Sequence, residues 1–156
     1  MQSEAHYETG LLEQPTLRFR RHPPISLLLD ARGLTVGFTT WKCRGLWAGA
    51  PGSILAVHEQ EQGPLLCAIH REWSLRWHWR VQDAEGDLVG RVEKDRILDP
   101  WGTLVLFCRK GSWFTLHGVE LARLEQGNQF LELQMLPPVQ HDPFAKMLLL
   151  AATLVH

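Results

Sequence analysis

The chain has 156 residues and a mass of 17.9 kDa, which suits one domain with a hydrophobic core of its own. Apolar residues make up 45% and charged residues 21%, a globular composition that excludes a disordered chain. The formal net charge of −1 argues against a dedicated nucleic-acid-binding protein, which normally carries a basic excess.

The cysteines and the start of the chain indicate a cytoplasmic protein. Cys43, Cys67 and Cys108 lie far apart and form no Cys-x-x-Cys pair, so neither a disulfide framework nor a zinc site is predicted. The first residues lack the basic and apolar segments of a signal peptide. We expect a cytoplasmic location, with peripheral attachment to a membrane as an option, and the sequence leaves the oligomeric state open.

Charge divides the first third of the chain. Residues 1–14 carry Glu4, Glu8 and Glu13 without any Lys or Arg, which predicts a flexible acidic tail before a single domain at 15–156. Residues 15–50 have a net charge of +5, because they contain six basic residues and one acidic residue, Asp30. Basic side chains attract anionic headgroups, so we expect a lipid- or anion-binding group here; the alternative is an ordinary first strand with its arginines in water. The members of this predicted group are Arg18, Arg20, Arg21, Lys42 and Arg44.

Segments of alternating polarity follow one another along most of the chain. In the clearest, 73–81, three tryptophans, Leu75 and Val81 alternate with polar residues, the period of a half-buried strand. Residues 83–86 then form a turn, and 88–92 return as the partner of a hairpin. Similar pairs elsewhere predict about ten to twelve strands in successive hairpins.

The polar face of the 73–81 strand is a second candidate anion-binding strip, made of Arg76, His78 and Arg80. The alternative is a solvated barrel exterior, with Trp73, Trp77 and Trp79 packed inside.

The last segment departs from the strand pattern. Pro137 and Pro138 end the sheet, and Asp142 with Pro143 provides an N-cap and a first helical residue, so a helix is predicted over about 143–156. It is apolar nearly all round, with Lys146 its only charge, yet too short to span a bilayer. The predicted fold is therefore all-β with one helix: a closed antiparallel barrel around a hydrophobic C-terminal helix. The expected core of that helix is Phe144, Met147, Leu148, Leu149, Leu150 and Leu154.

No enzyme motif accompanies these elements. The sequence has no nucleophile elbow, phosphate-binding loop or zinc-protease helix, and its histidines have no ligand spacing. We therefore predict no catalytic residue, no metal and no cofactor.

Several short motifs occur in an order known from one family. They are Trp79-Arg80-Val81, Asp83-x-x-Gly86, Val89-Gly90-Arg91, Trp101-Gly102 and the apolar helix after Asp142. Over roughly 25–156 the chain resembles the tubby-like β-barrel superfamily, in particular its phospholipid scramblase-related and LURP-one-related proteins.

The resemblance implies a barrel around a central helix that serves as a binding module. Phosphoinositide recognition is known in tubby members, and lipid scrambling is attributed to some scramblases. The calcium-binding segment that scramblases place before the last helix corresponds here to 139–142, which has one carboxylate, fewer than a calcium site needs.

We expect a non-catalytic binding or scaffold domain that contacts anionic phospholipid headgroups or a protein partner, with no nucleic acid and no transmembrane span. The alternatives are a phospholipid scramblase, in which the helix leaves the barrel, and a small-ligand carrier that uses an open barrel end.

Overall fold

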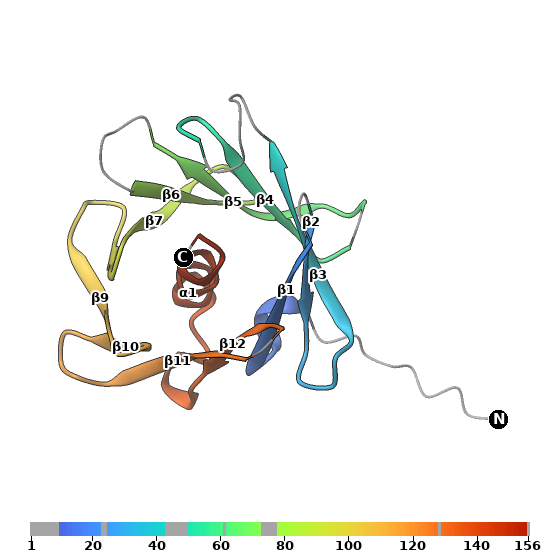
Figure 1. The fold of residues 1–156 in the computed structure, drawn as a ribbon. Helices are drawn as coiled ribbons and strands as arrows, with labels where there is room; N and C mark the ends of the chain where they lie inside the picture. The colour runs from blue at the N-terminus through green and yellow to red at the C-terminus, as the bar shows by residue number, and fades with distance from the viewer. Residues whose placement is uncertain are drawn as a thin grey trace.

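A computed structural model describes residues 10–22, 25–42, 50–60, 62–72, 78–127 and 129–155, with only the backbone at 21, 22 and 25. Its described strands form one closed barrel around a single α-helix (Figure 1). The strands are β1 (Thr16–His22), β2 (Ile25–Leu29), β3 (Thr35–Lys42), β4 (Ile54–His58), β5 (Leu65–Arg71), β6 (His78–Asp83), β7 (Leu88–Glu93), β8 (Arg96–Leu98), β9 (Leu104–Arg109), β10 (Ser112–Thr115), β11 (Glu120–Gln126) and β12 (Leu131–Met135). The helical elements are the short 3-10 turns η1 (Leu11–Glu13) and η2 (Pro137–Val139) and the helix α1 (Pro143–Leu154).

Each strand pairs antiparallel with the next along the chain, and β1 pairs with β12 to close the ring. Side chains on a strand alternate between its two faces, so each strand turns an apolar row inward. In β1, Leu17 and Phe19 are buried between the more exposed Arg18 and Arg20. The predicted closed antiparallel barrel with an enclosed C-terminal helix is confirmed.

Four hairpins share one turn. In each, the amide of the first residue donates to the carbonyl of the fifth, and the fourth residue is a glycine with φ between 82° and 88°. This backbone is the three-residue hairpin loop that needs a left-handed residue, which glycine adopts without steric cost. The turns are 30–34, 83–87, 99–103 and 115–119.

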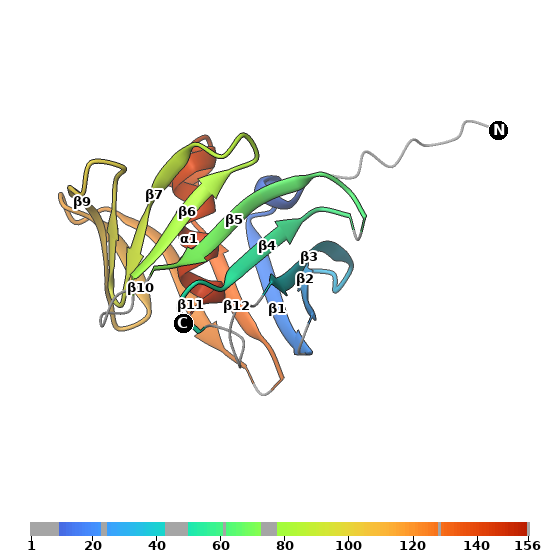
Figure 2. The ribbon, with the colours of Figure 1, turned by 90° about the horizontal axis from the view of Figure 1, so that it is seen from above.

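All four turns join an even-numbered strand to the next odd-numbered one, so they lie at the same end of the barrel. The chain also enters α1 at this end, which we call the turn end. Figure 2 shows the β6–β7 turn and the start of the helix at one end and the C-terminus at the other.

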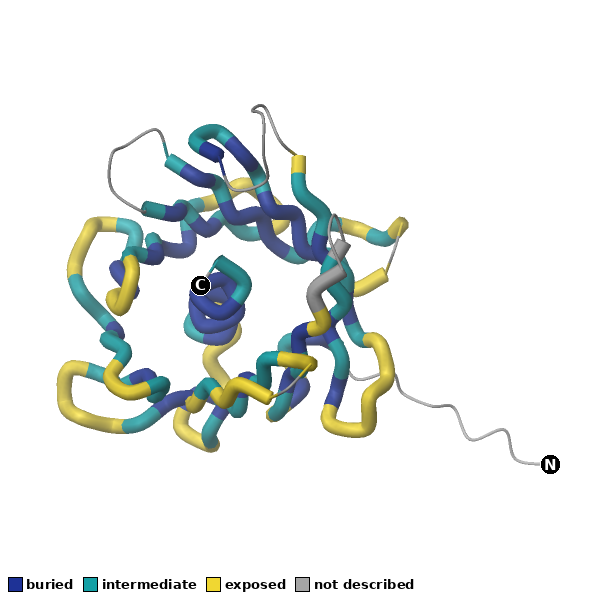
Figure 3. The backbone as a smooth tube through the Cα atoms, viewed as in Figure 1, coloured by how far each residue is buried: buried dark blue, intermediate teal, exposed yellow. Residues whose placement is uncertain are grey.

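The helix begins at the turn end and runs through the barrel. The Asp142 carboxylate accepts the amide of Ala145 at 3.0 Å, which caps the first turn. Leu149 and Leu150 are completely buried, and the helix is the buried centre of Figure 3. Gly90 of β7 permits this packing, since a Cβ there would lie 2.5 Å from the Leu98 carbonyl oxygen and 2.9 Å from Leu148 Cδ2.

Two sequence-based expectations about the turn end are wrong. Phe144, expected in the helix core, is 55% exposed, because it lies in the first helical turn before the helix enters the barrel. The flexible tail predicted at 1–14 extends too far along the chain, since Leu11 is completely buried and Gly10–Gln14 belongs to the fold. Residues 1–9 and His156 lie outside the described residues, and α1 ends at Leu154.

A buried lysine connects these two segments. Lys146 is only 4% exposed, and its ammonium donates to the Leu12 carbonyl of η1 at 2.6 Å. The Leu11 amide in turn donates to the Glu59 carboxylate at 2.8 Å. Polar contacts that the sequence pattern did not indicate thereby hold the segment before β1 against the helix and against the β4–β5 connection.

Candidate anion-binding surface

The predicted basic group on β1 is partly neutralised. Arg18 donates from Nε to the Glu132 carboxylate of β12 at 3.0 Å, and its guanidinium lies over the Phe130 ring at 4.9 Å. A hydrogen bond from Gln134, and then the contact with Arg18, holds the pKa of Glu132 below its ordinary value despite burial. Arg18 therefore contributes little free positive charge to an incoming anion.

Arg20 and Lys42 remain exposed on the outer wall. Neither forms an ion pair with a side chain in the described ranges. The registers of β1 with β2 and of β2 with β3 set Arg20 level with Phe38, two strands away. Lys42 lies four residues further along β3, so ideal strand spacing separates the Cα atoms of Arg20 and Lys42 by about 16 Å. The structure thus brings these two cations to one end of the barrel without joining them in one patch. The Arg21 side chain and Arg44 lie outside the described residues.

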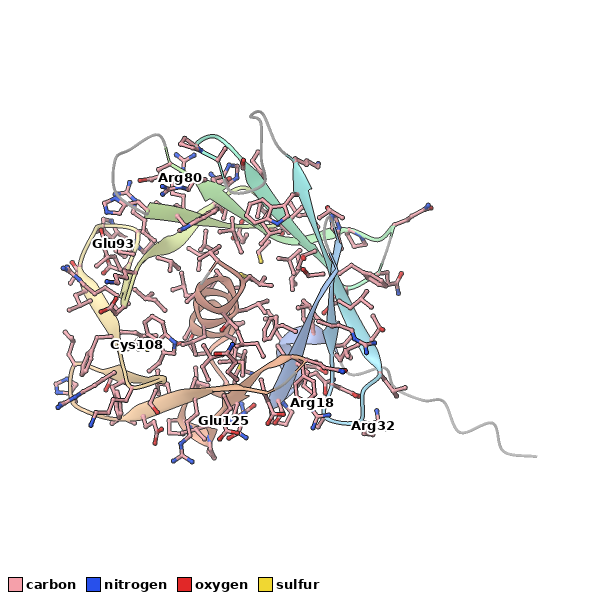
Figure 4. The ribbon with its side chains drawn as sticks, in the orientation of Figure 1. Arg18, Arg32, Arg80, Glu93, Cys108 and Glu125 are labelled. Carbon is pink, nitrogen blue, oxygen red and sulfur yellow. The ribbon has the colours of Figure 1, made fainter. Side chains whose placement is uncertain are left out.

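The second predicted strip is part of a mixed-charge network on β6 and β7. Arg76 lies outside the described residues, whereas His78 and Arg80 project from the outer face of β6. The β6–β7 register sets Arg80 opposite Arg91. Figure 4 shows Arg80 and Glu93 outside the wall, on the side of the barrel away from Arg18.

One carboxylate lies close to both of these arginines. Glu72 Oε1 lies 4.0 Å from Arg80 Nε and 3.7 Å from Arg91 Nε, ion-pair distances too long for hydrogen bonds. Like charges directly opposite on neighbouring strands repel, so this carboxylate offsets a local cost. Both arginine side chains are about two-fifths exposed, at 42% and 41%, although the Nε atom of each is buried.

The histidines beside this network have different surroundings. His78 lies 3.4 Å from Glu93 and 4.0 Å from Glu72. Burial, and then the nearby Arg80 guanidinium, lowers the pKa of His70 below its ordinary value, while a hydrogen bond with Gln82 opposes the shift. We therefore expect His70 to be neutral at pH 7.

Further cations lie at the end of the barrel where α1 ends. The β7–β8 and β9–β10 connections lie at this end. The first carries the exposed Lys94 and Asp95 before the exposed Arg96, and the second carries the exposed Lys110 directly after the exposed Arg109. Carboxylates are also present, such as Glu93, which lies 4.0 Å from Arg96. We call this end the basic end, defined by the exposed residues Arg20, Lys42, Lys94, Arg96, Arg109 and Lys110.

Sequence reasoning missed most of the basic end. Lys94 and Lys110 lie in two separate hairpin connections, and residues 91–156 as a whole are balanced in charge, so composition gave no signal. The Arg80–Arg91 pair could have been found, because a hairpin around the 83–87 turn sets these positions opposite one another.

The described residues contain no group of three His, Cys, Asp or Glu side chains placed to hold a metal ion. Burial raises the pKa of the Cys67 thiol to about 12, so it is not an activated nucleophile. Within the same residues, no helix is both long and apolar enough to span a bilayer.

A closed antiparallel barrel around one apolar helix is the class of fold that this chain adopts, and comparison with known proteins supports that class. No family model and no curated protein sequence matches the chain. Among solved structures it is similar to a protein from Arabidopsis thaliana, with a TM-score of 0.60 over 95% of this chain and 100% of the other, at 11% sequence identity. At this identity the likeness concerns the fold alone.

Proposed function

We propose that the protein is a non-catalytic binding module of the tubby-like superfamily, related to its scramblase-related and LURP-one-related proteins, whose basic end attaches to anionic phospholipid headgroups. The order of the sequence motifs and the barrel around a C-terminal helix support this relationship. The observation that carries the function is the separation of charge between the ends of the barrel. Exposed lysines and arginines gather at the basic end, whereas three of the four glycine turns at the turn end contain neither residue and the fourth contains Arg32.

The attachment is electrostatic and needs no pocket. Each cation near an anionic surface contributes about 1 kcal/mol, and the attraction decays within a Debye length. Arg20 and Lys42 on one side of the basic end and Lys94 and Lys110 on the other provide exposed charges that the described carboxylates do not pair. A few such contacts give reversible, salt-sensitive binding.

Sedimentation with vesicles tests the proposal. The protein should bind phosphatidylcholine vesicles that contain phosphatidylserine, should not bind phosphatidylcholine alone, and should dissociate at high salt. Lys94→Gln with Lys110→Gln should weaken binding by about 25-fold, since each lost cation is worth about fivefold. Arg20→Gln with Lys42→Gln should have a similar effect.

Matched controls separate charge from folding. Lys94→Arg with Lys110→Arg keeps the charge and should keep the binding. All variants should share the unfolding midpoint of the wild type, because these side chains are exposed. Unchanged binding by both neutralised pairs would exclude the basic end as the attachment surface. Transfer of fluorescent lipid between leaflets would instead identify a lipid translocator.

A further inference from the structure

The exposed large apolar side chains of the described residues are concentrated at the turn end, opposite the basic end. All but one belong to a turn-end connection or to the first turn of α1. Single exposed apolar residues are ordinary on a protein surface, but their collection at one end marks an interaction surface. The residues are Leu34, Trp101, Leu116, Val119, Phe144 and, as the exception, Phe130.

Trp101 is the most exposed of them, with 87% of its surface accessible. The turn beneath it is fixed, because the Asp99 carboxylate accepts the amides of Trp101 at 3.0 Å and Thr103 at 2.9 Å. Gly102 completes the turn with φ 86°. A rigid turn presents the indole at little further entropic cost, the property of an aromatic anchor at a protein interface.

Neighbouring connections extend the apolar surface along this edge. The β8–β9 turn and the β10–β11 turn are adjacent because β9 pairs with β10, and the second turn carries Leu116 at 58% and Val119 at 45% exposure. β12, the partner of β11, leads through η2 to the first turn of α1. We call residues 83–87, 99–103, 115–119 and 136–144 the turn-end rim.

The charge of the turn-end rim has one sign. Glu85, Asp87 and Asp142 are exposed, and Asp99 is half-buried. The rim contains no lysine or arginine. An anionic membrane would be repelled by these carboxylates, so the apolar tips are not suited to a lipid surface of that kind.

We propose that the turn-end rim docks a partner protein through a basic segment that also carries apolar side chains. The rim's carboxylates complement lysine or arginine, and Trp101, Leu116 and Val119 provide the apolar contacts. This surface is distinct from the basic end, so the protein connects an anionic surface at one end to a basic polypeptide at the other.

Titration of the isotope-labelled protein with a synthetic amphipathic helix of leucine and lysine tests the docking by nuclear magnetic resonance. The indole N–H of Trp101 and the amides of the turn-end rim should shift, and affinity should fall as salt is raised. Trp101→Ala should weaken binding about tenfold, and Glu85→Gln with Asp87→Asn by several-fold. These side chains are exposed, so an unchanged unfolding midpoint confirms that the variants fold.

Two controls make the test specific. The same peptide with glutamate in place of lysine should not bind, and Glu125→Gln at the other end of the barrel should leave the affinity unchanged. The proposal is overturned if the glutamate peptide binds equally, if shifts spread over every acidic surface, or if the lysine peptide does not bind at low salt. Shifts of Trp101 that depend on protein concentration alone would overturn it in favour of a second copy.

Discussion

The two ends of the barrel are built by the same hairpins yet differ in charge and polarity. At the turn end, short turns with a glycine at the fourth position expose apolar side chains and carboxylates. At the basic end, the connections and strand ends carry lysines and arginines. Successive connections in an antiparallel barrel alternate between its ends, so segments far apart in sequence form one surface. Connections that follow odd-numbered strands lie at one end and those that follow even-numbered strands at the other. The residues of each candidate binding surface are therefore neighbours in space without being close along the chain.

The helix runs from one end of the barrel to the other, and we expect the largest loss of stability from a substitution in its middle. Leu149→Ala should lower the free energy of unfolding by about 2–5 kcal/mol, because Leu149 is completely buried and its loss leaves a cavity. Phe144→Ala, at the turn end of the same helix, should cost less than about 1 kcal/mol, since Phe144 is half exposed. Urea denaturation measures both, and equal losses would contradict the placement of the helix inside the barrel.

The contact between Lys146 and η1 should be the next largest contributor and is specific to the turn end. Lys146→Met keeps most of the side-chain volume but removes the donor to the Leu12 carbonyl, with an expected loss of about 1–3 kcal/mol. The amides of Leu11 and Gln14 should then exchange with solvent faster than those of β12. Lys94→Met at the basic end is the matched control and should change little. A stabilised Lys146→Met would mean that the cost of burying the ammonium exceeds the benefit of its hydrogen bond.

The smallest expected effect depends on pH and concerns the β2–β3 turn. Burial alone would raise the pKa of Asp30, but the amides of Leu34 and Arg32 and the Arg32 guanidinium lower it below its ordinary value. Because the pKa of Asp30 is lower in the folded state than in the unfolded state, the ionised carboxylate stabilises the fold. This contribution to the free energy of unfolding is complete above the unfolded-state pKa, near 4, and is lost as the pH falls through the folded-state pKa. Asp30→Asn should therefore cost about 1 kcal/mol at pH 7 and nothing at strongly acidic pH.

Denaturation of the Asp30→Asn variant at several pH values measures this difference. Arg32→Gln should lose less, because both backbone hydrogen bonds to Asp30 remain. A difference between wild type and Asp30→Asn that does not decrease toward acid would contradict the role of the charged carboxylate.

The sequence predicted the fold better than the sites. Alternation in β1 and β6, the glycine turn after Asp83 and the Asp142 cap are local patterns, and each is present in the structure. The candidate cations were chosen by closeness along the chain, which does not report spatial neighbours. Arg18 is therefore paired with Glu132, a residue more than a hundred positions away. Arg80 lies opposite Arg91, which was not among the cations predicted to bind an anion.

By itself, the sequence determined the periodicity of its strands, the turns between them and a helix so apolar that a sheet must enclose it. These properties are local, since they follow from the conformational preferences and polarity of neighbouring residues. Only the tertiary structure decided which connections share an end, which charges are paired and how much of the helix is inside. Barrel closure and strand register are long-range properties, because they depend on pairing between distant residues. The extent of the closed barrel along the helix leaves Phe144 exposed to solvent and buries Leu149.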